Sequence, residues 1–372
     1  MRQYMSLNNG RFMDLASAEL RAMLRGRDAR ISIDADKGII FVSAEDPSGA
    51  LPNEIMEKSI FVNNIMEIES KAEALVCEDL AEHIRVLLEK GKSFRIEVKK
   101  IKALMQGNAK TIEVCLGSKL EAMGFIADLK SPEVLIGVVI AGSTAYIGKL
   151  QAMRIDYFRY CQSKAAINRS EFKLAEAFEF FGINAAAGGG PALDIGAAPG
   201  GWTDFMLSKG FRVIAVDAAS LIYSKLAERG SMLIISNSEE EQGGCAHYRI
   251  SMPISGGALA KMGQAAAPYR MVHVKMNLCA ESMPLIKELG PFSMLLIDAN
   301  TPPKESAGFA AELLPFMQRG ATLIMTMKLI DYDVQRHINS TIDMLGDSCA
   351  TIKIKRLPHN RRELTLYAQL KP

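Results

Sequence analysis

The segment from Ala192 to Asp217 constrains the fold of this chain more than any other part of the sequence. It reads ALDIGAAPGGWTDFMLSKGFRVIAVD, which is an apolar strand, a glycine-rich turn, a helix and a second apolar strand that ends on an acid. Short apolar runs such as FSMLLIDA and ATLIMTMKLI continue this alternation towards the carboxyl terminus. Continuous apolar strands separated by helices are typical of a parallel sheet covered on both faces. We therefore expect an α/β fold here.

The glycine-rich turn predicts a pocket for a nucleoside. Asp194 and Gly196 stand at the carboxyl end of the first strand, and Gly200 and Gly201 follow in the turn. Glycines have no Cβ, so the backbone can approach a ligand closely at these positions. Asp217 ends the second strand, where a carboxylate can accept hydrogen bonds from both hydroxyls of an adenosine ribose. Together these features indicate a nucleoside site at the switch point of an open sheet.

Two cofactor classes compete for this site. A nicotinamide dinucleotide site has the spacing GxGxxG, whereas Gly196 is followed by Ala197, Ala198 and Pro199. The pattern DxGxxPGG instead resembles the first motif of S-adenosylmethionine-dependent methyltransferases. The structural alternative is a tight strand-to-helix turn without a ligand, and the PGGW sequence with its second-strand acid argues against that alternative.

The resemblance implies S-adenosyl-L-methionine as the cofactor and implies no metal. Two of the implied contacts have alternatives. Trp202 either packs beside the methionine moiety or lies in the core, and Asn277 stands where such methyltransferases often carry an acid for the adenine amino group. An asparagine can still accept that hydrogen bond through its carbonyl. The implied cofactor-binding residues are Asp194, Gly196, Ala197, Pro199, Gly200, Gly201, Trp202, Asp217, Asn277 and Asp298.

Four residues outside the glycine-rich turn narrow the resemblance. Lys173 lies in RSEFKLAEAFEFFG, Asp298 ends the run LLIDAN, Lys328 ends a strand in TLIMTMKLI, and Glu363 begins the last strand in NRRELTLYA. Lys, Asp, Lys and Glu in this order resemble the catalytic tetrad of FtsJ-like RNA ribose 2′-O-methyltransferases. Each residue alone could be a solvated or paired surface residue; together they favour a catalytic site. The resemblance implies a Rossmann-like domain with a mostly parallel, seven-stranded sheet.

The chemistry of that family suits these residue types. A ribose 2′-hydroxyl must lose its proton to become a nucleophile, and a lysine can take the proton only when its amine is partly neutral. A second ammonium nearby and partial burial both lower a lysine pKa. Lys173 beside Lys328 would supply the second ammonium. Our hypothesis makes Lys328 the general base, supported by Lys173, Asp298 and Glu363.

The first 150 residues alternate short strands and helices. The stretch from Lys71 to Leu150, which ends in DLKSPEVLIGVVIAGSTAYIGKL, resembles a THUMP domain, an RNA-binding module. THUMP domains usually follow a small ferredoxin-like α+β domain. The resemblance implies four parts: a ferredoxin-like domain over 1–62, a THUMP domain over 63–150, a connector over 151–168 and the methyltransferase domain over 169–372.

Basic side chains support RNA as the partner. One cluster lies in and around the predicted strand SFRIEVKKI, and further bases in the connector alternate with aromatic side chains, as in proteins that bind unstacked nucleotides. A solvated face is the alternative for the cluster. The cluster contains Lys90, Lys92, Arg95, Lys99, Lys100, Lys102 and Lys110, and the connector together with the residue after it contains Arg154, Tyr157, Phe158, Arg159, Tyr160, Lys164 and Arg169.

The pairing of these modules resembles 23S rRNA cytidine 2′-O-methyltransferases, so we expect ribosomal RNA as the substrate, with transfer RNA as the alternative. An RNA-binding assembly factor without catalysis is the competing function of another class. A nicotinamide oxidoreductase is disfavoured by the missing GxGxxG. The region 218–250 matches no motif and is expected to be a variable loop.

Composition excludes few further functions. The net charge of +2 neither indicates nor excludes a nucleic-acid partner, and the six cysteines lack the spacing of zinc sites. The sequence has no run of about 18 apolar residues and no signal-like stretch at its N-terminus. We expect a cytoplasmic protein without a membrane partner. The oligomeric state does not follow from the sequence, and a monomer is favoured.

Overall fold

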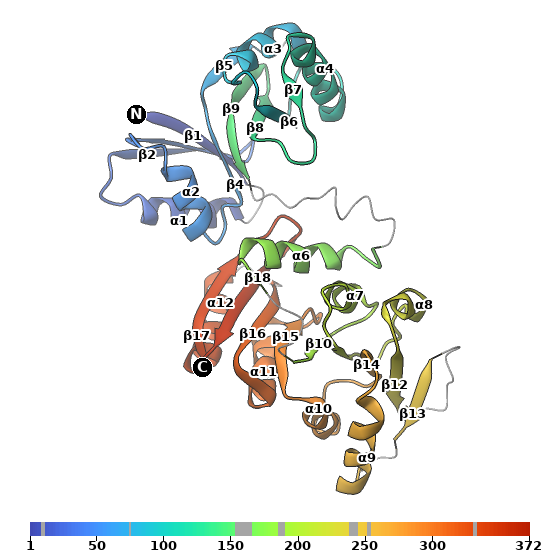
Figure 1. Cartoon of the computed structure of the whole chain (residues 1–372). Coiled ribbons are helices and arrows are strands. Elements are labelled where there is room, and N and C mark those ends of the chain that lie inside the picture. Colours follow the sequence, from blue (N-terminus) through green and yellow to red (C-terminus); the bar gives the residue numbers. More distant parts are fainter. Residues whose placement is uncertain are drawn as a thin grey trace. The chain divides into compact units, whose positions relative to one another are not determined.

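The computed structural model describes residues 1–8, 12–73, 76–152, 166–184, 190–237, 245–250, 254–329 and 333–372. The chain forms two compact units, Met1–Phe158 and Arg159–Pro372 (Figure 1). The division falls within the predicted connector. Residues 153–165 lie outside the described residues, so nothing tests the prediction for Arg154, Arg159 and Lys164 and for the aromatic residues between them.

The second unit contains one sheet of nine described strands. All neighbouring strands from the β13 edge to β16 are parallel, and only the two pairs that involve β18 are antiparallel. The mostly parallel sheet expected from the sequence is therefore confirmed. The strands lie in the order β13 (Ala246–Arg249), β12 (Met232–Ser236), β14 (Met271–Val274), β11 (Val213–Val216), β10 (Ala192–Ile195), β15 (Phe292–Ile297), β16 (Met317–Lys328), β18 (Glu363–Leu370) and β17 (Cys349–Lys355).

Two strands exceed the expected seven, and both come from the region predicted to be a loop. β12 and β13 extend the sheet beyond β14. All five residues of β12, MLIIS, are buried, as in a central strand of a parallel sheet. The same region contains the short helix α8 (Tyr223–Leu226) and a 3-10 turn, Ala227–Arg229. The loop prediction was wrong because the polar run SNSEEEQGG outweighed the apolar run that precedes it.

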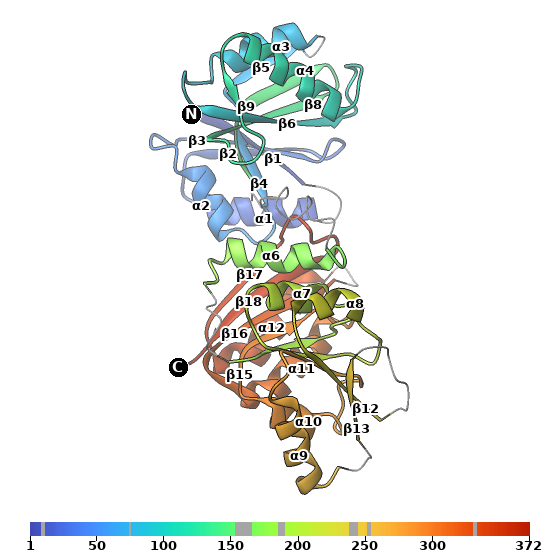
Figure 2. The ribbon, with the colours of Figure 1, turned by 45° about the vertical axis from the view of Figure 1, so that its right-hand side comes forward.

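Helices connect most of the parallel strands of this sheet. The chain moves from β10 to β11 in one direction along the sheet and from β15 to β16 in the other. Because parallel crossovers are right-handed, α7 and α11 lie on opposite faces. α6 packs against α7 on one side of the sheet, and α11 packs against α12 (Figure 2). The helices are α6 (Ser170–Phe180), α7 (Gly201–Ser208), α9 (Gly256–Ala266), α10 (Met283–Leu289), α11 (Pro303–Leu313) and α12 (Val334–Leu345).

The first unit is built on a second sheet, with strands in the order β2-β3-β1-β4-β9-β8-β6-β7 and β5 paired to β9. Helices α3 and α4 cover β6, β8 and β9, and Ile84 of α3 and Leu116 of α4 belong to the same apolar core as Ile136 of β8. The strands are β1 (Arg2–Leu7), β2 (Ala29–Asp34), β3 (Ile39–Ala44), β4 (Asn64–Glu67), β5 (Ser70–Glu73), β6 (Ser93–Ile101), β7 (Ile126–Ala127), β8 (Val134–Ala141) and β9 (Thr144–Ala152). The helices are α1 (Phe12–Met23), α2 (Leu51–Lys58), α3 (Cys77–Arg85) and α4 (Ala109–Ala122).

The first four strands and two helices run β1-α1-β2-β3-α2-β4, which is the element order of a ferredoxin-like unit. The fourth strand lies beyond residue 62 and pairs with both β1 and β9, so the sheet continues through the predicted boundary. The limits of the ferredoxin-like and THUMP domains therefore stay predictions.

Candidate active site

The carboxyl ends of three central strands lie at one edge of the second unit's sheet. β10, β11 and β15 end in register with one another. Gly196, Asp217 and Asp298 directly follow these strands and therefore lie side by side. Asn277 follows β14 at the same edge and is exposed. Four of the predicted positions thus meet at the place where ligands bind in open α/β sheets.

The glycine-rich turn is tightly packed by the protein itself. Gly196 has a φ of +75°, and a Cβ there would lie 2.8 Å from the Cα of Ala299. Gly200 has a φ of +114°, and a Cβ there would lie 3.1 Å from Cδ1 of Leu226. Gly201 begins α7. Glycine is therefore required at 196 and 200 by the backbone and its neighbours, besides any contact with a ligand.

Asp217 ties the glycine-rich turn to the end of the second strand. Its Oδ2 accepts a hydrogen bond from the Ala198 N–H at 3.0 Å, and its Oδ1 accepts one from the Ala219 N–H at 2.8 Å. Ala197 is buried beside it, and the Pro199 carbonyl accepts a hydrogen bond from the Ile222 N–H at 2.9 Å. A carboxylate accepts about four hydrogen bonds, so these two donors among the described residues leave further lone pairs on Asp217.

A buried histidine that the sequence analysis did not single out supports Asp217. His273 on β14 donates through Nε2 to the Asp217 carbonyl at 3.0 Å, and its Nδ1 accepts a hydrogen bond from the Tyr223 hydroxyl at 2.7 Å. Burial lowers the pKa of His273 to about 4, so the imidazole is neutral at pH 7. The segment HVKMNL drew attention through Asn277 alone, and a single histidine in an apolar strand carries no signal of its own.

Asp194 is the most deeply buried of the predicted cofactor residues. Its Oδ2 accepts a hydrogen bond from the Thr203 hydroxyl at 2.7 Å, while its Oδ1 has no hydrogen-bond partner among the described residues. Burial away from water, together with the nearby Asp298 and Asp217 carboxylates, raises the pKa of Asp194 to about 7 despite the opposing Thr203 hydrogen bond. An unpaired buried carboxylate oxygen is costly unless a donor reaches it.

Trp202 links two helices of the second unit. Its side chain is buried on α7, and its indole N–H donates to the Ser170 carbonyl at 2.8 Å. Ser170 begins α6, so the tryptophan joins the two helices on this side of the sheet.

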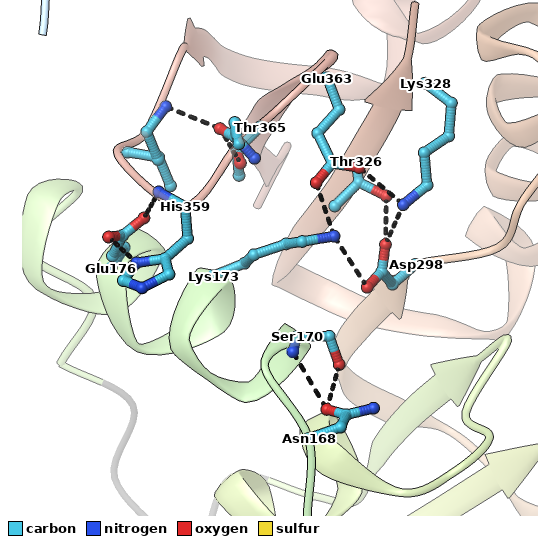
Figure 3. A network of polar contacts seen from close by, with 12 residues as sticks. Asn168, Ser170, Lys173, Glu176, Asp298, Thr326, Lys328, His359, Glu363 and Thr365 are labelled. Atoms are coloured by element: carbon cyan, nitrogen blue, oxygen red, sulfur yellow. Dashed lines mark hydrogen bonds and ion pairs between the residues drawn. The ribbon is translucent and has the colours of Figure 1, made fainter. Parts of the chain in front are cut away.

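The four tetrad residues meet in one network (Figure 3). Lys328 Nζ donates to Asp298 Oδ1 at 2.6 Å and to Glu363 Oε2 at 2.7 Å. Lys173 Nζ lies 2.6 Å from Glu363 Oε1 and 3.5 Å from Asp298 Oδ2. Each carboxylate therefore bridges both ammonium groups, and the four formal charges cancel. We call this arrangement the lysine–carboxylate ring.

The ring draws on four separate elements. Lys173 comes from α6, Asp298 follows β15, and Lys328 and Glu363 are direct cross-strand partners at the ends of β16 and β18. The four side chains are between 9% and 20% exposed. The ring is thus partly accessible although its charges are largely desolvated.

Thr326 is a fifth member that the sequence analysis missed. Its hydroxyl donates to Asp298 Oδ1 at 2.7 Å. It lies two residues before Lys328 on β16, and alternate residues of a strand share a face. The alternation in TMK was the available signal, because the face that carries Lys328 must also carry Thr326.

The pKa of Lys328 is raised, whereas the sequence analysis expected it to be lowered. Burial lowers this pKa, but the nearby Asp298 and Glu363 carboxylates outweigh burial and raise it above the ordinary value of 10.5. The pKa of Glu363 moves the other way: burial raises it, and the Lys328 and Lys173 ammonium groups bring it below 4.5. The prediction of a lowered lysine pKa counted the second ammonium without the two carboxylates between the lysines.

The basic residues predicted as an RNA-binding cluster do not all lie on one face of β6. Along β6 the side chains alternate between two faces, so Lys99 and Lys100 point apart. Lys100 donates to the Met105 and Gly107 carbonyls. Exposed ion pairs involve most of the others: Lys92 with Glu89, Arg95 with Glu97, Lys102 with Asp36 and Lys110 with Glu113. Lys90 and Lys99 stay exposed, and Arg95 and Lys110 line a groove of about 300 Å³ between α4 and β6.

Neither a membrane-spanning helix nor a metal-binding cluster occurs in the described part of the chain. None of its helices is long and apolar enough to cross a membrane. No group of three or more His, Cys, Asp or Glu side chains among these residues is arranged to hold a metal ion.

Comparison with known proteins gives a family match in the second unit. Residues 166–240 match the family described as FtsJ-like methyltransferase. This segment contains Lys173 and the whole glycine-rich turn, so the match confirms the resemblance drawn from those motifs. The matched residues lie outside the predicted THUMP domain, which stays a prediction.

Two curated relatives share parts of the chain. "Ribosomal RNA large subunit methyltransferase M" of Laribacter hongkongensis (strain HLHK9) is 49% identical over 57 residues, or 14% of this chain and 16% of that protein. The protein of the same name from Cellvibrio japonicus (strain Ueda107) is 38% identical over 101 residues, or 24% of this chain and 29% of that protein. The matched segments thus span less than a third of either relative.

Among solved structures, TrmN from Thermus thermophilus is similar over the full length of both chains, with 14% identity and a TM-score of 0.35.

Proposed function

We propose that this chain is an S-adenosylmethionine-dependent RNA methyltransferase that modifies a ribose 2′-hydroxyl, with a cytidine of large-subunit ribosomal RNA as the target. The lysine–carboxylate ring carries this proposal, because a partly open ring of two lysines and two acids stands beside the turn that matches the FtsJ-like family. The names of the two relatives favour ribosomal RNA as the substrate. A cytoplasmic location is part of the same proposal.

The residues at the carboxyl edge of the sheet fit this cofactor. When bound, S-adenosyl-L-methionine supplies the methyl group on a positively charged sulfonium. Asp217 keeps lone pairs for ribose hydroxyls. Asp194 Oδ1 is a buried acceptor that a ligand's donor would satisfy. Asn277 is exposed at the same edge and is proposed to accept from the adenine amino group.

Lys328 is the proposed general base. An ammonium has three N–H donors, and the Asp298 and Glu363 oxygens take two of them, which leaves the third direction for the ribose hydroxyl. The 2′-oxygen passes its proton to the neutral Nζ and becomes the nucleophile that methylation requires. A lysine with a pKa of 10.5 is neutral at pH 7 at a cost of about 5 kcal/mol, and the raised pKa of Lys328 adds to this cost.

The other members of the ring orient the base. Asp298 accepts from both Lys328 and the Thr326 hydroxyl, which leaves its carboxylate little freedom to rotate. Glu363 bridges Lys328 to Lys173 on α6. Lys173 adds a positive charge within reach of the same carboxylates, and this charge favours the neutral form of Lys328. Groups held in place in this way raise the reaction rate by aligning the reacting atoms.

The experiment that tests the function is a map of 2′-O-methylated riboses in RNA from cells with and without the gene for this chain. We expect one methylated cytidine in large-subunit RNA to disappear and to return with the intact gene but not with a Lys328→Ala gene. A lost ribose methyl in transfer RNA would move the substrate to the alternative class. An unchanged map in both RNA classes would contradict the proposal.

A further inference from the structure

One buried acid of the second unit takes no part in the reaction described so far. Glu176 lies on α6, and its side chain is buried, as is that of His359 in the turn between β17 and β18. Glu176 Oε2 accepts the His359 backbone N–H at 2.9 Å, and Glu176 Oε1 contacts His359 Nδ1 (Figure 3). The His359 ring also packs against Phe172, with ring centres 5.3 Å apart.

The position of this pair relates it to the lysine–carboxylate ring. Glu176 follows Lys173 by three residues, so the two side chains lie on the same face of α6. Their partners, His359 and Glu363, are four residues apart and belong to one turn and the strand that it enters. The same helix therefore contacts the same turn at two adjacent points, and one of these contacts belongs to the ring.

Hydrogen bonds join this turn to β18 and to the end of β16. Asn360 Oδ1 accepts from the Leu357 N–H at 2.6 Å and from the Thr365 hydroxyl at 3.1 Å, which joins the turn to β18. The Leu329 N–H donates to the Arg362 carbonyl at 2.9 Å, so the β16–β18 pairing continues beyond Lys328 and Glu363. With these bonds in place, a displacement of His359 moves the start of β18 and hence Glu363.

We propose that Glu176 and His359 are positioning residues for methyl transfer: their buried contact holds the β17–β18 turn against α6 and thereby sets Glu363 between the two lysines. This inference rests on the proposed function. Neither residue touches the reacting atoms. A carboxylate buried without a partner is costly, and the imidazole and backbone N–H of His359 together provide that partner.

The test measures single-turnover methyl transfer to large-subunit RNA at saturating RNA and cofactor, together with both affinities. Glu176→Ala and His359→Phe should each lower the rate about 100-fold, the loss typical of a misplaced catalytic group. Both affinities should stay within about threefold, because positioning acts on the transition state alone. Glu176→Gln keeps an acceptor for the His359 N–H and should recover most of the rate. Glu179→Ala is the control, since Glu179 is exposed on the same helix.

A double-mutant cycle separates positioning from general damage to the fold. If Glu176 acts through Glu363, Glu176→Ala should lower the rate no further in a Glu363→Gln background. Full additivity of the two losses would overturn the proposal, and so would a wild-type rate in Glu176→Ala. A wild-type chain that transfers no methyl to any RNA would instead defeat the proposed function, so the two failures are distinguishable.

Discussion

Lysines in the two units of this protein have opposite surroundings. In the second unit Lys173 and Lys328 are 14% and 20% exposed, and each contacts two carboxylates. In the first unit Lys92, Lys102 and Lys110 are between 46% and 67% exposed, and each has one carboxylate partner nearby in an ion pair. The buried lysines come from elements far apart in the sequence, whereas the exposed lysines come from one short stretch.

This difference in burial determines how strongly each group of lysines interacts with its carboxylate partners. An exposed ion pair contributes between about 0 and 1 kcal/mol to stability and is screened by salt. Desolvated charges interact more strongly, and removing one partner leaves a charge that the site cannot hydrate. We therefore expect substitutions in the lysine–carboxylate ring to change the reaction and the local stability, and substitutions among the exposed lysines to change little beyond long-range attraction of RNA.

The largest effect is expected from Lys328→Ala. Removing the proposed base should lower the single-turnover rate by roughly 10³-fold or more, consistent with the loss of general-base catalysis together with the ordering of the ring. The affinities for S-adenosyl-L-methionine and RNA should change little. Lys110→Ala is the matched control in the first unit and should transfer methyl at the wild-type rate. Equal losses of rate in both variants would contradict the proposed difference between the buried and the exposed lysines.

The next effect is a dependence of the rate on pH. Because the folded pKa of Lys328 lies above 10.5, its neutral fraction grows about tenfold per pH unit throughout the range below that value. The rate of methyl transfer should therefore rise by about 100-fold from pH 7 to pH 9 without a plateau, wherever chemistry limits the rate. Rapid-quench measurement in short reactions checks this. A plateau near pH 8 would contradict either the raised pKa or the role of Lys328.

The raised pKa of Lys328 also affects the stability of the folded protein. A raised lysine pKa stabilises the folded state fully below pH 10.5, and this contribution is lost as the pH rises through the folded pKa. The lowered pKa of Glu363 stabilises the folded state above about pH 4.5, and this contribution is lost as the pH falls through its folded value. The ring is thus complete across the range in which the rate is measured.

A smaller effect concerns local stability. Lys173→Ala removes a charged hydrogen bond to Glu363 and should cost about 1.5–3 kcal/mol. Lys110→Ala removes an exposed pair with Glu113 and should cost about 0.5 kcal/mol or less. Hydrogen exchange followed by mass spectrometry reports α6 and α4 separately and checks both values in the intact chain. A loss at α6 no greater than that at α4 would contradict the account of burial.

The smallest effect concerns RNA binding by the first unit. Lys90 and Lys99 are exposed and have no carboxylate partner among the described residues. Replacing both by alanine should weaken RNA binding a few-fold and reduce the slope of affinity against salt by about 1–2. Replacing the paired Lys92 and Lys102 should change the slope less. A larger change from the paired residues would show that ion pairing does not decide which lysines contact phosphate.

The sequence predicted what depends on local patterns. Alternation of apolar strands and helices gave the sheet, and the motif order gave the four tetrad residues, which the structure brings together. The sequence could not predict contacts between distant segments. Glu176 and His359 are 183 residues apart, and no spacing rule relates them. The wrong direction for the Lys328 pKa has the same origin, since the order of residues does not show that both carboxylates lie between the two lysines.

The glycine-rich turn shows a related limit. Glycine at 200 suggested close approach of a ligand, but its φ of +114° and its contact with Leu226 make glycine necessary for the fold as well. A Gly200→Val variant would therefore strain the backbone besides blocking a ligand. An Asp217→Asn variant avoids that strain, because the new side chain has the same shape and keeps one acceptor oxygen for the turn.

The most direct test of the central claim is the single-turnover rate of methyl transfer by Lys328→Arg. Arginine keeps the positive charge and can still donate to the Asp298 and Glu363 carboxylates, but its pKa above about 12 prevents it from accepting a proton near neutral pH. We expect a rate as low as that of Lys328→Ala, with both affinities preserved. A rate close to that of the wild type would contradict the assignment of Lys328 as the base and leave the ring with an electrostatic role only.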